Sequence, residues 1–232
     1  GLHRVVTTGR TETSILHGCD LELHGGGLIA VVGHSGSGKS SLLMCLSGLD
    51  EPTSGTVTIN GRDVYQQSAA KRAKMLRSEV GFVFQQYNLV PFLTVEENIA
   101  LPFRLGHEPA PHDLIRDLIE SFGLSRCSRT PARSLSGGEQ QRTALCRALA
   151  RHPGIVFADE PTGALDSRST QIVLGTLRRM ADEGQMIIMV THDLDAAAMA
   201  DRIVIMHDGR TVRHLGRCAS QELLQFMTDP KA

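Results

Sequence analysis

Short apolar runs of strand length alternate with amphipathic stretches along this chain. The runs at residues 28–32, 80–84, 155–158 and 186–190 are almost entirely apolar. Such runs are typical of parallel strands that are covered on both faces. Residues 167–183 form an amphipathic stretch between two of them. Strands that alternate with helices predict a mainly parallel α/β sheet, with a ligand site at the carboxyl ends of its strands.

Antiparallel structure is expected on both sides of this core. We expect strands within residues 2–32, including one at Leu21–Leu23. The strand 56–59 leads into Asn60-Gly61, a dipeptide that favours a tight hairpin. The runs 203–206 and 211–212 flank Asp208-Gly209 and predict a terminal hairpin, which a last helix at 222–227 follows.

The segment from about residue 86 to 150 has a helical pattern. Thr94 and Glu97 have the spacing of a capping box, and residues 114–122 place their apolar side chains on one helical face. We expect prolines to divide the segment into pieces, at Pro102, Pro109 and Pro111. Because strand-like sequence resumes after it, we interpret it as a helical insertion in one domain, 1–232. Residues 1–85 and 151–232 would form the core, together with the antiparallel β subdomain.

A glycine-rich turn follows the first core strand. It has the spacing G-x-x-x-x-G-K-S and comprises Gly33, His34, Ser35, Gly36, Ser37, Gly38, Lys39 and Ser40, with Ser41 next in the helix that follows. A buried strand, this turn and a helix together predict a phosphate-binding P-loop. Backbone N–H groups and the helix N-terminus would bind the phosphates, Lys39 would reach the β- and γ-phosphates, and Ser40 would hold Mg²⁺.

Charge and composition narrow the function classes. The net charge is −1 and no polybasic run occurs, so nothing indicates a nucleic-acid partner. The five cysteines form no C-x-x-C pair, which favours reduced thiols in a cytosolic protein. No apolar run approaches the roughly 20 residues that span a bilayer. If the protein works on a membrane, we expect its membrane part to be another chain.

Polar residues follow three of the buried strands and would meet at one edge of the sheet. Asp159 and Glu160 follow residues 155–158, and we assign Asp159 to Mg²⁺ and Glu160 to the attacking water. Gln85 could supply oxygen to the metal or to the water, although an ordinary loop residue is the alternative. His192 follows residues 186–190 and would sense the γ-phosphate, although a lone histidine there is more often structural.

A second helix start has an anion-binding pattern. Ser136, Gly137 and Gly138 precede the helical residues 143–151. Two phosphate-binding helix ends in one chain favour two chains that share nucleotide, each covering the P-loop of the other.

The stretch Leu135–Arg142 resembles the signature motif of ABC transporter ATPases. Other segments match family motifs in the family order: Walker A at 33–40, the Q-loop at Gln85, Walker B with the catalytic glutamate at 155–160, the D-loop at Ala164–Asp166 and the switch histidine at His192. Residues 48–55, 82–102 and 158–163 look most like the lipoprotein-release and macrolide-export branch.

The resemblance implies an ATP- and Mg²⁺-dependent ATPase that forms a head-to-tail dimer. Each ATP would lie between one P-loop and the partner's Ser136–Gly138, near Asp166, with Glu160 as general base. A separate integral-membrane permease would dock on the helical insertion and the groove near Gln85. The protein would then lie peripherally on the cytoplasmic face of the plasma membrane. An ATPase that regulates a non-transporting membrane complex, in cell division or cell-wall remodelling, is the alternative.

Two positions depart from the family pattern. The residue that usually stacks on adenine is aromatic, but the corresponding position falls near Val6, and no Phe, Tyr or Trp precedes Tyr65. Weaker adenine recognition, a shifted register and replacement by His3 all remain open. Gly27 stands where the family often has glutamate, and we expect little effect from it.

Overall fold

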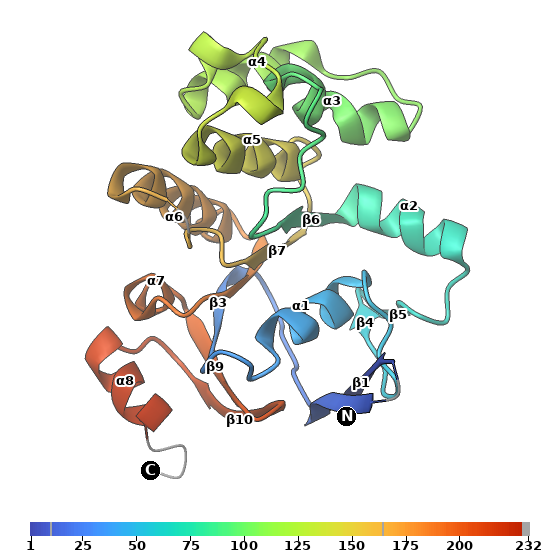
Figure 1. The fold of residues 1–232 in the computed structure, drawn as a ribbon, viewed down its shortest axis with the longest axis vertical. Helices are drawn as coiled ribbons and strands as arrows, with labels where there is room; N and C mark the ends of the chain where they lie inside the picture. The colour runs from blue at the N-terminus through green and yellow to red at the C-terminus, as the bar shows by residue number, and fades with distance from the viewer. Residues whose placement is uncertain (10, 164, 229–232) are drawn as a thin grey trace.

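The computed structural model describes residues 1–9, 11–163 and 165–228, and its centre is a six-stranded sheet. The strand order is β10-β9-β3-β8-β7-β6 (Figure 1). The bounds are β3 Gly27–Val32, β6 Val80–Val83, β7 Ile155–Asp159, β8 Met186–Val190, β9 Arg202–His207 and β10 Arg210–Leu215. Every pairing is parallel except that of β10 with β9. The prediction of a mainly parallel α/β sheet is confirmed, as is the terminal hairpin.

The register of these strands aligns their carboxyl ends. Val190 at the end of β8 pairs with Val31 of β3 on one side and with Asp159 of β7 on the other. Val83 of β6 pairs with Ala158. The residues that follow the four strands therefore emerge at one edge of the sheet, which is where the candidate catalytic groups were expected.

Alternate residues of each strand enter two separate cores. On β3, Leu28, Ala30 and Val32 face one apolar cluster, whereas Ile29 and Val31 face the other. The first cluster continues through α3, α4, α5, α6 and α7, and the second packs against α1, β1 and β2. Both faces of the parallel sheet are thus covered, as its all-apolar strands require.

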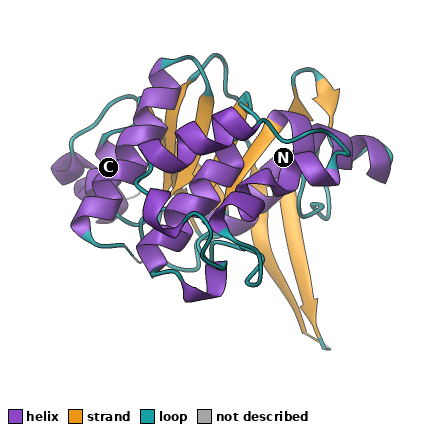
Figure 2. Cartoon of the chain, turned by 90° about the horizontal axis from the view of Figure 1, so that it is seen from above, coloured by secondary structure: helices purple, strands orange, loops and turns teal. Residues whose placement is uncertain are grey.

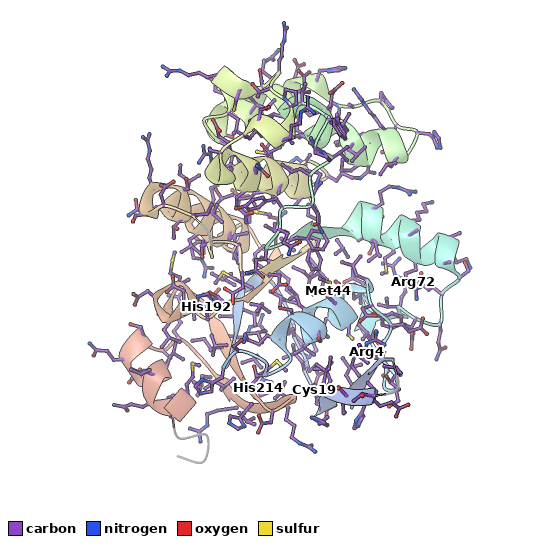
Figure 3. The ribbon with its side chains drawn as sticks, in the orientation of Figure 1. Arg4, Cys19, Met44, Arg72, His192 and His214 are labelled. Atoms are coloured by element: carbon purple, nitrogen blue, oxygen red, sulfur yellow. The ribbon has the colours of Figure 1, made fainter. Side chains whose placement is uncertain are left out.

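The antiparallel elements lie beside the sheet. β1 (Leu2–Thr8) and β2 (Thr11–Cys19) form a two-stranded ribbon that extends away from the helices (Figure 2). Arg4 of β1 contacts Asp50 at 2.7 Å and so ties the ribbon to the end of α1 (Figure 3). β4 (Thr58–Ile59) and β5 (Arg62–Asp63) form the predicted hairpin around Asn60-Gly61.

The strand expected at Leu21–Leu23 is wrong. These residues are irregular between β2 and β3, and no strand pairs with them among the described residues. Leu21 and Leu23 still pack against the second apolar cluster. Their alternation reflects this partial burial and not a place in a β-ladder.

The helices α3 (Val95–Leu105), α4 (His112–Ser121) and α5 (Gly137–Leu149) gather at one end of the molecule (Figure 1). The capping box of Thr94 and Glu97 is confirmed at the start of α3. Pro102 does not break this helix as expected, but lies inside it. An internal proline costs about 3 kcal/mol, and the burial of Ile99 and Phe103 in the first cluster offsets that cost.

The remaining helices cover the sheet and its edges. Their bounds are α1 Lys39–Ser47, α2 Ala69–Glu79, α6 Ser167–Asp182, α7 Leu194–Ala198 and α8 Ser220–Thr228, with short 3₁₀ turns at Ser125–Cys127 and Ala132–Ser134. The pattern predicted α6 and α8, with ends that differ by a few residues. It did not indicate α7, a single short turn that Asp193 caps.

The carboxylate of Asp201 joins three elements at the edge of the sheet opposite the carboxyl ends of the parallel strands. Asp201 accepts hydrogen bonds from the backbone of Leu28 on β3, from Arg178 on α6 and from Arg217 beyond β10. Burial opposes ionisation of Asp201, but these bonds outweigh it and lower its pKa to about 2. Gly27 has φ 123°, and a Cβ there would lie 3.0 Å from Asp201 Oδ2. Glycine at this position therefore has a structural reason.

We predict that Asp201→Asn lowers the free energy of unfolding by about 2 kcal/mol at pH 7, because hydrogen bonds to a charged group are lost. The folded pKa of Asp201 is depressed from 3.8, so its contribution is present above pH 4 and is lost as the pH falls towards 2. Urea unfolding of parent and variant at several pH values measures this. A stability difference that did not shrink below pH 4 would contradict it.

Candidate active site

The glycine-rich turn wraps around the start of α1, at the carboxyl end of β3. A Cβ on Gly33 would lie 2.4 Å from the backbone oxygen of Met206, so only glycine fits there. No side chain caps the N-terminus of α1. Its first backbone N–H groups are therefore available to an anion, with the partial positive charge of the helix end behind them.

Lys39 is held inside the turn. It is 8 % exposed, and Nζ donates hydrogen bonds of 2.8 Å to the backbone oxygens of Gly33 and His34. Burial lowers the pKa of Lys39, while the negative charges of Glu160 and Asp159 raise it. A compact positive charge thus lies directly beneath the loop where phosphates would bind.

Ser40 and Asp159 meet across 119 residues of sequence. Ser40 Oγ donates to Asp159 Oδ1 at 2.9 Å. Asp159 is 6 % exposed at the end of β7, and burial raises its pKa. No cluster of three His, Cys, Asp or Glu suited to a metal occurs in the described ranges. One hydroxyl and one carboxylate fit Mg²⁺, which takes hard oxygen ligands and completes its shell with substrate phosphates and water.

Glu160 and His192 form a pair beside this site. His192 Nδ1 lies 2.9 Å from Glu160 Oε1, and the His192 backbone N–H donates to Oε2 at 3.4 Å. Glu160 is 12 % exposed and His192 is 71 % exposed. The Glu160 backbone has φ 46°, a left-handed conformation that is unfavourable for a residue with a side chain. Surrounding contacts must hold it there.

One cavity of about 520 Å³ brings most of the predicted residues together. It is lined by Ile15, Ser35, Gly36, Gly38, Lys39, Ser40, Ser41, Gln85, Glu160 and His192. The structure thus places the P-loop, Gln85, Glu160 and His192 around one space, with Asp159 behind Ser40. Parallel strands with aligned ends explain the convergence.

Ser136–Gly138 and Asp166 do not line this cavity. Ser136 caps α5 and forms a capping box with Glu139, whose pKa these hydrogen bonds to Ser136 lower. Asp166 caps α6 and accepts bonds from Ser169. Ala164, in the predicted D-loop, lies outside the described residues.

Sequence reasoning missed two residues around the site. Ile15 lines the cavity because β2 packs against the loop, its backbone oxygen 3.0 Å from where a Cβ on Gly38 would lie. Neither Val6 nor His3 is among the lining residues. Gln141 of α5 donates to the backbone oxygen of Pro161, next to Glu160. Only its position in the signature stretch could have drawn attention to it.

Comparison with known proteins identifies the family. Residues 16–163 match the family described as ABC transporter. The chain belongs to the ABC transporter family. It therefore contains an ATP-binding and ATP-hydrolysing cassette, and the resemblance drawn from the motifs is confirmed.

Curated relatives are export proteins. The chain is 43% identical over 218 residues to the macrolide export ATP-binding/permease protein MacB of Azoarcus sp. (strain BH72), covering 93% of the chain and 33% of that protein. It is 42% identical over 206 residues to the pyoverdine export ATP-binding/permease protein PvdT of Pseudomonas aeruginosa, covering 88% and 31%. The chain thus spans about a third of the length of these relatives.

Solved cassettes have the same fold. The dimeric post-hydrolysis structure of the ATP-binding cassette MJ0796, bound to ADP and Pi, matches with a TM-score of 0.87 at 32% identity, covering 94% of this chain and 97% of that one. A second dimeric MJ0796 structure matches at 33% identity with the same score. Within the described part of this ABC ATPase, no helix combines the length and apolar character that crossing a membrane requires.

We predict that Lys39→Ala weakens ATP binding roughly ten- to a hundredfold, because a charge-assisted contact to phosphate is lost. Isothermal titration with ATP and Mg²⁺ measures the affinity. Lys74→Ala removes an exposed charge on α2 and is the matched control. Full retention of affinity by Lys39→Ala would reject its role at the phosphates.

Proposed function

We propose that this ABC ATPase hydrolyses Mg²⁺-ATP in a head-to-tail dimer and thereby drives an export-type permease. The observation that carries the proposal is the composition of the cavity. It contains the phosphate loop, Gln85, Glu160 and His192, whereas Ser136–Gly138 lie outside it. A second copy would supply those residues and complete the site.

Glu160 and His192 have the geometry for hydrolysis. In the proposed reaction, water attacks the γ-phosphorus, its proton passes to Glu160, and the bond from the γ-phosphorus to the bridging oxygen breaks to release ADP. His192 holds the Glu160 carboxylate through Nδ1 and can present Nε2 to the γ-phosphate. Lys39 neutralises charge on the β- and γ-phosphates. Ser40, Asp159 and Gln85 would hold Mg²⁺, which offsets the phosphate charge when bound.

The dimer proposal is supported by the two solved structures of the MJ0796 cassette, both of which are dimeric. We propose that the N-terminus of α5, at Ser136–Gly138, contacts the partner's nucleotide, although in the single chain Ser136 and Glu139 cap it. Asp166, at the start of α6, would lie at the same interface. We propose that ATP closes two copies around these groups and that hydrolysis releases them.

A groove of about 330 Å³ supports a membrane partner. Side chains of α2, β6, α3 and α5 line it, and Leu105 among them is 62 % exposed. Exposed apolar side chains around a groove are typical of a protein interface. We propose that a permease inserts a segment here, on a separate chain at the cytoplasmic face of the membrane. The relatives' names combine ATP-binding and permease parts.

We predict that Leu105→Asp loses the membrane-bound fraction of the protein and leaves its basal ATPase rate unchanged. A charge on the groove rim opposes insertion of an apolar segment, while Leu105 does not line the nucleotide cavity. Sedimentation with membranes of the source cell measures the fraction bound. Val212→Asp, on exposed β10, is the control. Unchanged sedimentation of Leu105→Asp would reject this docking groove.

We predict that Glu160→Gln binds ATP and dimerises but hydrolyses it at least about a hundredfold more slowly, because general-base catalysis contributes roughly 10²- to 10⁴-fold. Phosphate release and light scattering measure the two effects. Undiminished turnover would reject Glu160 as the base. A monomer at saturating Mg²⁺-ATP would reject spontaneous closure and make the membrane partner necessary for it.

The Glu160→Gln variant also tests whether the protein recognises the adenine base of ATP. No aromatic side chain occurs near Val6, and Ile15 is the apolar residue of the ribbon that lines the cavity. Stacking on an aromatic contributes roughly 1–3 kcal/mol per base in nucleic-acid complexes. Dimerisation with ATP but not with GTP would show that the protein recognises adenine without an aromatic stacking residue. Dimerisation with both would show that base selectivity is lost here.

A further inference from the structure

The signature helix α5 is bonded directly to the turn that carries Glu160. Gln141 is 1 % exposed, and its Nε2 donates a hydrogen bond of 2.6 Å to the backbone oxygen of Pro161. Pro161 follows Glu160 immediately and is itself buried. The hydrogen bond therefore fixes the Pro161–Thr162 peptide, one unit beyond the residue proposed as the general base.

The amide of Gln141 is poorly suited to a purely structural role. Its Oε1 is buried and has no hydrogen-bond partner. A buried acceptor without a partner destabilises the folded state, and an apolar side chain of the same shape would remove this penalty. Stability alone would favour methionine at this position.

The turn needs support at this point. Glu160 has φ 46°, and its backbone N–H donates to the Val190 oxygen at 2.9 Å. Within the described residues of the segment that follows, Gly163 N donates to the Glu160 oxygen at 3.2 Å and Leu165 N donates to the Thr162 oxygen at 3.1 Å. Gln141 supplies a further contact, from a different helix. Without it the Pro161–Thr162 peptide has no bond to α5, and the turn that holds Glu160 loses this support.

A second tether reaches the other end of the same segment. Arg142 Nη1 donates to Ser169 Oγ at 2.9 Å, and Ser169 Oγ donates to Asp166 Oδ2 at 2.9 Å. Adjacent residues of α5 therefore contact the segment 161–169 at both ends. A displacement of α5 moves the Glu160 turn together with the start of α6.

We propose that Gln141 is a positioning residue that sets the Glu160 carboxylate for hydrolysis and couples it to the position of α5. The inference rests on the proposed role of Glu160. When Ser136–Gly138 at the start of α5 engage nucleotide, the shift of the helix reaches Glu160 through this one hydrogen bond.

Gln141→Met tests the proposal, with Gln185→Met as the matched control. Gln185 Nε2 also donates to a proline oxygen, that of Pro153, but at the opposite edge of the sheet. We expect Gln141→Met to lower kcat about fivefold, the range of one hydrogen bond, with KM for ATP within about twofold of the parent. Its thermal midpoint should equal or exceed that of the parent. Gln185→Met should leave kcat unchanged.

A double-mutant cycle separates positioning from a general effect. In the Glu160→Gln background, single-turnover hydrolysis should be unaffected by Gln141→Met, because the residue acts through Glu160. A further fivefold loss of rate in that background would overturn the proposal. Full activity of Gln141→Met alone would also overturn it. So would a fall in the thermal midpoint of Gln141→Met large enough to explain the lost rate. If Glu160→Gln itself retained full turnover, the assignment of Glu160 as the general base would be rejected instead.

Discussion

The parallel register of β3, β8 and β7 is the constraint on which the site depends. Val190 pairs with Val31 on one side and Asp159 on the other, so three strands end at one level. The P-loop, Glu160 and His192 follow those strand ends. The strand register alone therefore brings them close together. The hydrogen bond between Ser40 and Asp159 spans 119 residues of sequence yet results directly from this register.

Several residues of the site have environments or backbone conformations that are unfavourable when taken alone. Lys39 and Asp159 are buried, and burial opposes the charged form of each. Glu160 has a left-handed backbone. Such features persist only where the surrounding structure determines them, and here the two apolar clusters on either face of the sheet supply that rigidity. ATP would replace the carbonyl oxygens that now accept bonds from Lys39, so the loop is already shaped for the phosphates.

The sequence correctly predicted the features that depend only on interactions between residues close together in the chain. The Asn60-Gly61 hairpin and the capping box at Thr94 depend on neighbouring residues alone, and both are present. Pro102 and Leu21–Leu23 were misjudged because tertiary packing overrode the local pattern. Ile15 and Gln141 were missed because each reaches the site from another element. The family motifs supplied the candidate residues, but no spacing rule indicated which bonds join them.

The separation of Ser136–Gly138 from the cavity gives the proposed dimer a physical reason. A chain that held both anion-binding helix ends around one cavity could bind and hydrolyse ATP alone. Here the cavity contains the proposed base and the P-loop, whereas Ser136–Gly138 do not line it. Because Gln141 ties α5 to the turn after Glu160 and Arg142 ties it to the start of α6, occupancy of the helix end would act on the proposed base of the same chain. Each copy would then hydrolyse its own nucleotide only when it also contacts that of its partner, which makes hydrolysis follow closure.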